Sequence, residues 1–381
     1  MGKYIIYFGH FELPDKNALA HRVQANARMF ESLGYKVILV GYNKNTREKY
    51  HKHNDYWYEV RYPQNLKDWI SDFESYKLID EIIQKNGASN CDAIIATGVG
   101  AGNTLGLIRL SKKHHISFIS DLVDWVMYSK RRPIYNLIKF IYDYLLCSLI
   151  IQKAVNNHIY ISSHLKAKYK SSRRNTVVIP SLTYKSDPRF SGLTGYRSQE
   201  TIKMCYAGNP GRRGSKDRLD WCVMAFNEND SVDASLDIYG MDMSTFIEEY
   251  PNIPVNNARI VFHGRCSNTE CLNSISVSDY FVFAREKSEV TESGFPTKFS
   301  EALAVGTPVI TTPTSDLRRY LENGKNGFIS SECSYKSFSL AMKEALSMNK
   351  NQRESMHNNP SPLDETYWRE ELWHFLKEMK C

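Results

Sequence analysis

The chain has 381 residues, of which 42% are hydrophobic and 12% aromatic, and this composition excludes a largely disordered protein. No apolar run reaches the roughly 18 residues of a membrane-spanning helix, which argues against an integral membrane protein. The apolar run near the start is shorter than the core of a signal peptide, and the eight cysteines form no Cys-x-x-Cys pair. We therefore expect a cytoplasmic protein with reduced thiols.

Positive charge is concentrated in the first half of the chain. Residues 1–200 contain 29 Lys and Arg against 17 Asp and Glu, and residues 109–174 contain 13 against 3. A basic surface of this kind attracts anionic partners such as nucleic acid, anionic lipid or a phosphorylated substrate. The sequence contains no recognised nucleic-acid-binding motif, so we do not expect nucleic acid to be the partner.

Apolar runs alternate with helix-like segments, which is the pattern of parallel α/β architecture. A stretch rich in Ser, Gly and Pro, residues 181–200, is expected to link two doubly wound domains. We expect an N-terminal domain at 1–185, a C-terminal domain at 186–362 and an amphipathic helix within 363–381. Strands are expected at residues 3–9, 36–41, 92–98, 116–121, 201–208, 235–240, 259–264, 279–285 and 308–312.

Residues 282–329 contain an ordered set of short motifs. Gly294–Phe295 is followed by Glu301–Ala302 and then by Gly306–Thr307–Pro308 before an apolar run. This order resembles the donor-binding region of glycosyltransferase family 4, and the resemblance continues more weakly into the first 200 residues. It implies a GT-B fold, in which two Rossmann-like domains face each other across a cleft. It also implies an N-terminal acceptor-binding domain, a C-terminal domain that binds the nucleotide-sugar, and retention at the anomeric carbon.

A helix expected to begin near Thr297 would direct free backbone N–H groups at a donor diphosphate. Lys298 lies in its first turn, where a cation is unfavourable for the helix dipole, so a phosphate partner is the functional explanation and a solvated lysine the alternative. The resemblance implies that Glu301 accepts the hydroxyls of the donor ribose. Simple pairing of Glu301 with the helix dipole is the alternative.

The chain departs from the family at the first member of its glutamate pair. The expected position is Ser293, with Glu292 beside it and Glu289 nearby. We assign the role beside the donor sugar to Glu292, and Glu289 is the alternative. Gly294 and Phe295 complete this part of the predicted donor site.

A glycine-rich loop with three cations follows the strand at 201–208. After Gly208, the residues Arg212, Arg213 and Lys216 precede the next helix-like segment. Arginine binds phosphate oxygens in pairs and lysine acts as a point charge, so this loop suits a diphosphate. We assign stabilisation of the diphosphate charge to Arg212 and Lys216, and Arg213 could substitute. A solvated surface loop without a ligand is the alternative.

The predicted site requires no metal and no bound cofactor. The chain contains no Asp-x-Asp motif, which another class of sugar transferases uses to hold a metal-bound diphosphate. Arg212, Lys216 and Lys298 could instead neutralise the departing diphosphate. We find no protein nucleophile.

Two positions in the first domain are candidates for the reacting centre. Gly9 follows the first strand in a loop that, by the resemblance, closes over donor and acceptor, and Asn17 is expected to cap the next helix. Asp121 ends the strand at 116–121 and could accept a proton from the acceptor hydroxyl, with a structural capping role as the alternative. The glycine-rich turn at 98–102 imitates a dinucleotide-binding motif, but its third glycine falls one position early.

The segment 130–174 combines an apolar helix with flanking basic residues. Arg131, Arg132 and Lys139 are predicted to meet an anionic membrane surface, and a core helix with a basic rim is the alternative.

Together these features predict a metal-independent hexosyltransferase that moves a sugar, most simply from a UDP donor, to a glycan or a lipid-linked glycan. Its place would be cell-surface polysaccharide biosynthesis, in the cytoplasm or on the inner face of the membrane. Two alternatives remain: a GT-B sugar-nucleotide epimerase, and a non-catalytic partner subunit that binds a nucleotide-sugar.

Overall fold

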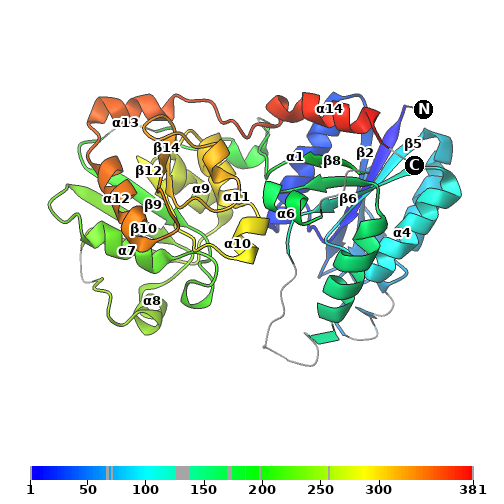
Figure 1. Ribbon diagram of the computed structural model, residues 1–381, viewed down its shortest axis with the longest axis horizontal. Coiled ribbons are helices and arrows are strands. Elements are labelled where there is room, and N and C mark those ends of the chain that lie inside the picture. The colour runs from blue at the N-terminus through cyan, green and yellow to red at the C-terminus, as the bar shows by residue number, and fades with distance from the viewer. Residues whose placement is uncertain are drawn as a thin grey trace. The chain divides into compact units, whose positions relative to one another are not determined.

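The computed structural model describes residues 2–65, 68–69, 72–125, 137–138, 140–169, 174–184, 186–196, 199–255 and 258–379. The chain forms two compact units (Figure 1). Unit 1 comprises Met1–Tyr184 and Glu365–Cys381, and unit 2 comprises Lys185–Asp364. The chain therefore returns to unit 1 at its C-terminal end.

The described part of unit 1 contains an eight-stranded sheet in the order β3-β4-β2-β1-β5-β6-β7-β8. All neighbouring strands are parallel except β3 and β4. The central strand β1 is buried along its whole length, as expected for a parallel sheet with both faces covered. The strands are β1 (Tyr4–Gly9), β2 (Lys36–Asn43), β3 (Tyr50–Lys52), β4 (Trp57–Arg61), β5 (Cys91–Thr97), β6 (Ser117–Leu122), β7 (Asn157–Tyr160) and β8 (Asn175–Val178).

Helices connect the strands of this sheet. Asn17 caps the first of them, since its side chain accepts a hydrogen bond of 2.8 Å from the backbone N–H of Ala20, which confirms the predicted cap. The helices are α1 (Ala18–Ser32), α3 (Tyr76–Asn86), α4 (Ala101–His114), α6 (Ser163–Lys168) and α14 (Arg369–Lys377), with a π-helix at Ile141–Ile151 and 3₁₀ turns at Ala88–Asn90, Gln152–Ala154 and Glu365–Trp368.

The C-terminal helix α14 packs within unit 1, beside α1 and β8 (Figure 1). Leu372 and Phe375 are buried on one face of α14, as the amphipathic pattern predicts. The side chain of Asn175 on β8 donates a hydrogen bond of 2.7 Å to the carbonyl of Phe375. The last helix therefore completes the packing of the first unit.

Unit 2 contains a parallel sheet of six described strands in the order β11-β10-β9-β12-β13-β14. The strands are β9 (Ile202–Ala207), β10 (Ala234–Tyr239), β11 (Ile260–Gly264), β12 (Tyr280–Val282), β13 (Val309–Thr311) and β14 (Gly327–Ile329). The helices are α7 (Leu219–Asn227), α8 (Met243–Glu249), α9 (Asn268–Ser276), α10 (Glu289–Ser293), α11 (Thr297–Ala304), α12 (Tyr335–Leu346) and α13 (Lys350–His357), with 3₁₀ turns at Pro188–Phe190, Arg212–Gly214 and Leu317–Arg319.

All nine predicted strands are present, and the helix predicted near Thr297 begins there. The strands that were not predicted from the sequence are β3, β4, β7, β8 and β14, each only three to five residues long. Short runs of this kind lack enough alternation to stand out from loops. Among the described residues, none of the helices is both long and apolar enough to cross a bilayer.

Candidate functional site

The strand order of unit 2 reverses between β9 and β12, because the chain first builds β10 and β11 on one side of β9 and then β12, β13 and β14 on the other. In doubly wound sheets, ligands bind outside the carboxyl ends of the strands at such a reversal. Four side chains meet at this place, and we call them the Asp217 cluster: Tyr206 on β9, Asp217 after β9, Arg285 after β12 and Lys298 on α11.

Asp217 is the centre of this cluster, and its side chain is fully buried. Lys298 Nζ lies 2.6 Å from Asp217 Oδ2, and Arg285 Nε lies 2.8 Å from Asp217 Oδ1. The hydroxyl of Tyr206 donates a hydrogen bond of 2.9 Å to Asp217 Oδ2. Two cations therefore share one carboxylate, and the cluster carries a positive charge in excess.

Burial changes the proton affinity of these groups. Removal from water lowers the pKa of Lys298, Asp217 opposes that shift, and the charges of Arg285 and Lys216 add to it. Burial would raise the pKa of Asp217, but Lys298 and Arg285 hold it below its usual value. An anion bound beside Lys298 would favour the charged form of this lysine.

Gly208 leaves room for Lys298 at the end of β9. The φ angle of Gly208 is +137°, and a Cβ atom at this position would clash with Lys298 Nζ. Lys298 Nζ also lies 4.5 Å from the centroid of the Tyr206 ring, within the range of a cation–π interaction. Gly208, Tyr206 and Asp217 thus fix the lysine, whose side chain is 13% exposed.

The loop after β9 carries the three cations predicted to hold phosphate. Arg212, Arg213 and Lys216 are all exposed. The backbone N–H of Arg213 donates a hydrogen bond of 2.9 Å to Glu249 Oε2. Lys216 directly precedes Asp217, and its charge adds to the positive potential at Lys298. Exposed and buried cations therefore lie close together around the same loop.

Glu301 lies in α11, one turn after Lys298, and is largely buried. Arg189 Nη1 lies 2.6 Å from Glu301 Oε1, and Arg189 Nη2 lies 2.6 Å from Asp187 Oδ2. This second ion-pair group fixes the position of the Glu301 carboxylate. Arg189 comes from the stretch predicted to be a linker, so part of that stretch packs in unit 2.

The residues before α11 differ in exposure. Ser293 is fully buried, Phe295 is 6% exposed with its ring against two other aromatic rings, and Gly294 follows α10 in an extended conformation. Glu292 is half-buried, and its Oε1 accepts a hydrogen bond of 3.1 Å from the backbone N–H of Ser315. The half-buried Glu292 carboxylate is thus partly accessible to solvent, beside residues that carry no charge.

Residues 210–360 match the family model of glycosyl transferases group 1. The matched segment lies within unit 2 and includes Asp217, Arg285 and Lys298, together with Glu292 and Glu301. The match to this family model is therefore confined to unit 2. No curated protein matches the chain in sequence.

Solved structures match almost the whole chain at low sequence identity. Sucrose-phosphate synthase from Thermosynechococcus elongatus is 15% identical, with a TM-score of 0.61 and 99% of each chain covered. A glycosyltransferase from Rickettsia africae ESF-5 is 16% identical, with a TM-score of 0.62 and 99% of each chain covered. WaaG, a glycosyltransferase involved in lipopolysaccharide biosynthesis, is 12% identical, with a TM-score of 0.59 and coverage of 98% of this chain and 100% of WaaG. These matches confirm the predicted α/β fold with two Rossmann-like domains, the GT-B fold.

In unit 1, Asp121 belongs to a buried ion pair. Arg22 Nη2 lies 2.7 Å from Asp121 Oδ1, and the hydroxyl of Tyr7 donates to Oδ2. The side chains of Arg22 and Asp121 are 2% and 0% exposed, and Arg22 also donates to the carbonyls of Ile179 and Pro180. Asp121 thus ties β6 to β1 and α1, a structural role that differs from the loop capping considered above.

Gly9 has a packing explanation in the same unit. A Cβ atom on Gly9 would clash with the backbone oxygen and the methyl group of Thr97, because β1 and β5 approach closely at this point. The close approach of the two strands therefore accounts for a glycine here without a ligand.

The predicted membrane residues Arg131, Arg132 and Lys139 lie outside the described residues. Next to them, the described side chains of Leu137, Ile138, Ile141 and Leu145 are 42–52% exposed.

Within the described ranges, no group of three or more His, Cys, Asp or Glu side chains is arranged to hold a metal ion.

Three members of the buried ion-pair groups, Asp217, Arg285 and Arg189, were not predicted from the sequence. One signal was available for Arg285, because it follows the apolar run that forms β12. A cation at the carboxyl end of a buried strand at a strand-order reversal is a candidate ligand group. Asp217 and Arg189 form contacts with residues far away in the sequence, and no local pattern identifies them.

Proposed function

We propose that the chain is a retaining, metal-independent hexosyltransferase of glycosyltransferase family 4 that uses a UDP-sugar. The Asp217 cluster carries this proposal, because it places two buried cations of the segment matched by the family model at the strand-order reversal of unit 2. In that position, Lys298 and Arg285 can meet the diphosphate of a nucleotide-sugar. The exposed cations Arg212 and Lys216 extend the positive surface along the same loop.

Charge stabilisation is the chemical task of these residues. As the bond between the anomeric carbon and the phosphate oxygen breaks, negative charge grows on the departing diphosphate. Lys298, Arg212 and Lys216 stabilise this charge more strongly in the transition state than in the ground state, which lowers the barrier. Fixed cations perform this task without a metal ion.

Two carboxylates are assigned to the remaining parts of the donor. Glu301, held by Arg189, accepts the ribose hydroxyls, and Glu292 lies beside the donor sugar. Their different surroundings support this division, because Glu301 is fixed by an ion pair whereas Glu292 is half-buried and accessible.

The acceptor in this proposal is a glycan or a lipid-linked glycan in cell-surface polysaccharide biosynthesis, and the enzyme works in the cytoplasm or on the inner face of the membrane. The exposed apolar side chains of Leu137, Ile138, Ile141 and Leu145 support contact with lipid, since exposed apolar patches of this kind favour an interface. The structural likeness to WaaG is consistent with this pathway.

The test is calorimetric titration of the full chain with UDP, ADP and GDP, with and without EDTA. We expect UDP to bind most tightly and EDTA to leave its affinity unchanged. A second measurement follows the consumption of UDP-sugar, which we expect only when a glycan acceptor is present. Consumption of UDP-sugar without an acceptor would indicate the epimerase, and binding without turnover would indicate the non-catalytic subunit. Activity that is lost in EDTA and restored by Mg²⁺ or Mn²⁺ would contradict metal independence.

A further inference from the structure

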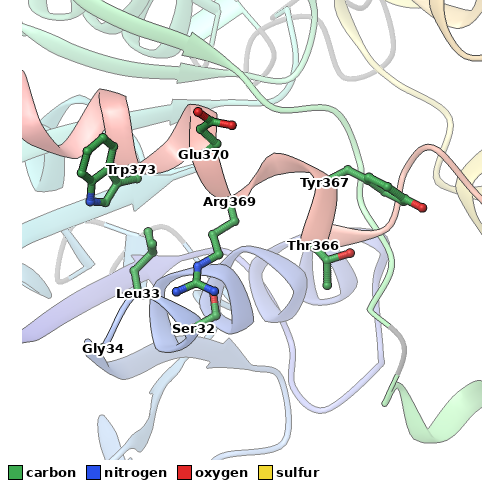
Figure 2. Close-up of a pocket in the computed structure, with 8 residues that line it drawn as sticks. All are labelled: Ser32, Leu33, Gly34, Thr366, Tyr367, Arg369, Glu370 and Trp373. Atoms are coloured by element: carbon green, nitrogen blue, oxygen red, sulfur yellow. The ribbon is translucent and has the colours of Figure 1, made fainter.

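Unit 1 contains a shallow cavity of about 670 Å³ between α1 and α14 (Figure 2). We call it the α1–α14 pocket. It lies where α1 ends and the chain enters β2 at Lys36, at the amino-terminal edge of the parallel strands. The strands β1 and β5 end at the opposite edge of the sheet. The pocket is lined by Ser32, Leu33, Gly34, Thr366, Tyr367, Arg369, Glu370 and Trp373.

Two exposed aromatic side chains border this pocket. Tyr367 is 59% exposed and Trp373 is 40% exposed, which is unusual for rings of this size. Figure 2 shows them on either side of Arg369, whose side chain extends from α14 toward the end of α1. The ammonium of Lys377 lies 3.5 Å from the centroid of the Trp373 ring and covers one face, so a ligand can stack only on the other.

The polar groups of the pocket have no net charge. Arg369 and Glu370 contribute one charge of each sign. The hydroxyl of Ser32 donates a hydrogen bond of 2.8 Å to the carbonyl of Met29, so Ser32 can offer a ligand only an acceptor. Glu370 Oε1 lies 3.8 Å from His374 Nε2, a long contact between two exposed side chains of α14. An anionic ligand would gain little from this arrangement, whereas a ligand with many hydroxyl groups finds donors and acceptors between two rings.

We propose that the α1–α14 pocket binds a neutral oligosaccharide chain. Pyranose rings have an apolar face that stacks on aromatic rings and a hydroxyl rim that hydrogen-bonds to charged side chains, and the pocket offers both. Its volume lies in the range of small-molecule sites. The proposal rests on the proposed function only for the class of ligand, a glycan. The pocket is at the amino-terminal edge of the sheet, and ligands of such sheets react at the opposite edge. The part of the oligosaccharide bound here would therefore lie away from its reacting hydroxyl group.

The test is calorimetric titration of the full chain with maltohexaose, cellohexaose and chitohexaose, each compared with its disaccharide. We expect saturable binding of at least one hexasaccharide, tighter than that of its disaccharide. Trp373→Ala and Tyr367→Ala should each weaken binding about three- to tenfold, the factor that corresponds to one stacked ring. Trp373→Phe should retain most of the affinity.

A matched control is Tyr56→Ala, because Tyr56 is 48% exposed in unit 1 and does not line the pocket. It should leave oligosaccharide affinity unchanged. The proposal is overturned if none of the three hexasaccharides binds, or if the Trp373→Ala/Tyr367→Ala double variant binds as well as the unaltered chain. Titration of the unaltered chain with UDP separates the two hypotheses. Absence of UDP binding would contradict the proposed function, whereas the oligosaccharide titrations would still decide whether the pocket binds a glycan.

Discussion

Lys298 Nζ and Asp217 Oδ2 lie 2.6 Å apart, although the two residues are 81 positions apart in the sequence. The contact joins the first turn of α11 to the loop that follows β9. A buried lysine without a counter-ion would either lose its proton or move its ammonium group into solvent. Asp217 therefore keeps Lys298 charged and oriented. Arg285 shares the same carboxylate and leaves part of the positive charge for a ligand.

Removal of the lysine charge should weaken donor binding. Lys298→Ala removes one charge-assisted hydrogen bond to phosphate, worth about 1.5–3 kcal/mol, and should raise the Kd for UDP about ten- to a hundredfold. Turnover should fall further, because the charge on the leaving diphosphate grows in the transition state. Calorimetry with UDP and UDP-sugar consumption measure the two effects. Lys325→Ala is the control, because Lys325 forms only an exposed ion pair. Unchanged UDP affinity in Lys298→Ala would contradict the assignment.

Removal of the shared carboxylate should destabilise unit 2. Asp217→Ala leaves Lys298 and Arg285 without their buried counter-ion, which costs about 3–5 kcal/mol. Urea denaturation measures this loss. Asp220→Ala is the comparison, because Asp220 is also buried but pairs with Arg218, whose side chain is 23% exposed, and this loss should cost less. Equal losses in the two variants would show that the Asp217 cluster contributes no more than this partly exposed ion pair.

A methyl group at position 208 should disturb the position of Lys298. In Gly208→Ala, the new Cβ would meet Lys298 Nζ, and the φ of +137° is strained for alanine. We expect weaker UDP binding together with a loss of about 1 kcal/mol or more in the free energy of unfolding. Gly195→Ala is the control, because its φ is not positive and the space that a methyl group would fill has no other atom within 4 Å. Normal UDP affinity in Gly208→Ala would show that Lys298 can move without consequence.

Loss of the Glu301 carboxylate should affect the nucleoside more than the diphosphate. Glu301→Gln keeps the shape of the side chain but weakens both the Arg189 ion pair and the acceptance of ribose hydroxyls. We expect the affinity for UDP to fall about tenfold while that for pyrophosphate is unchanged. Glu322→Gln, at an exposed ion pair, should change neither. If UDP and pyrophosphate affinities fall together in Glu301→Gln, the residue acts on the phosphates or on the fold instead.

The sequence predicted the local parts of this structure but not the contacts between distant residues. The strands β1, β9 and β12 are apolar runs, and α11 begins where its motif places it. Propensity and periodicity act over a few residues, so these elements could be predicted. The pairing of Asp217 with Lys298, or of Arg22 with Asp121, depends on strand order and on loop conformation. For the same reason, no local pattern predicts that the Asp121 carboxylate is fully buried.

Unit 1 should lose stability as the pH falls, because of a buried histidine. His158 on β7 is fully buried and stacked on Tyr160, with 5.3 Å between ring centroids. Burial lowers its pKa from 6.5 to about 3, and the positive charge of Arg174 adds to the effect. Between these two values the unfolded chain binds a proton that the folded chain does not, so the free energy of unfolding falls by about 1.4 kcal/mol for each pH unit below 6.5.

The variant His158→Phe tests this prediction, because phenylalanine keeps a ring on Tyr160 but does not titrate. Urea denaturation of the variant should show a loss in the free energy of unfolding between pH 7 and pH 5 that is about 2 kcal/mol smaller than in the unaltered chain. His374→Gln is the control, since the His374 side chain is 62% exposed, and its pH dependence should match that of the unaltered chain. An identical pH dependence in His158→Phe and the unaltered chain would show that His158 does not govern the acid sensitivity of unit 1.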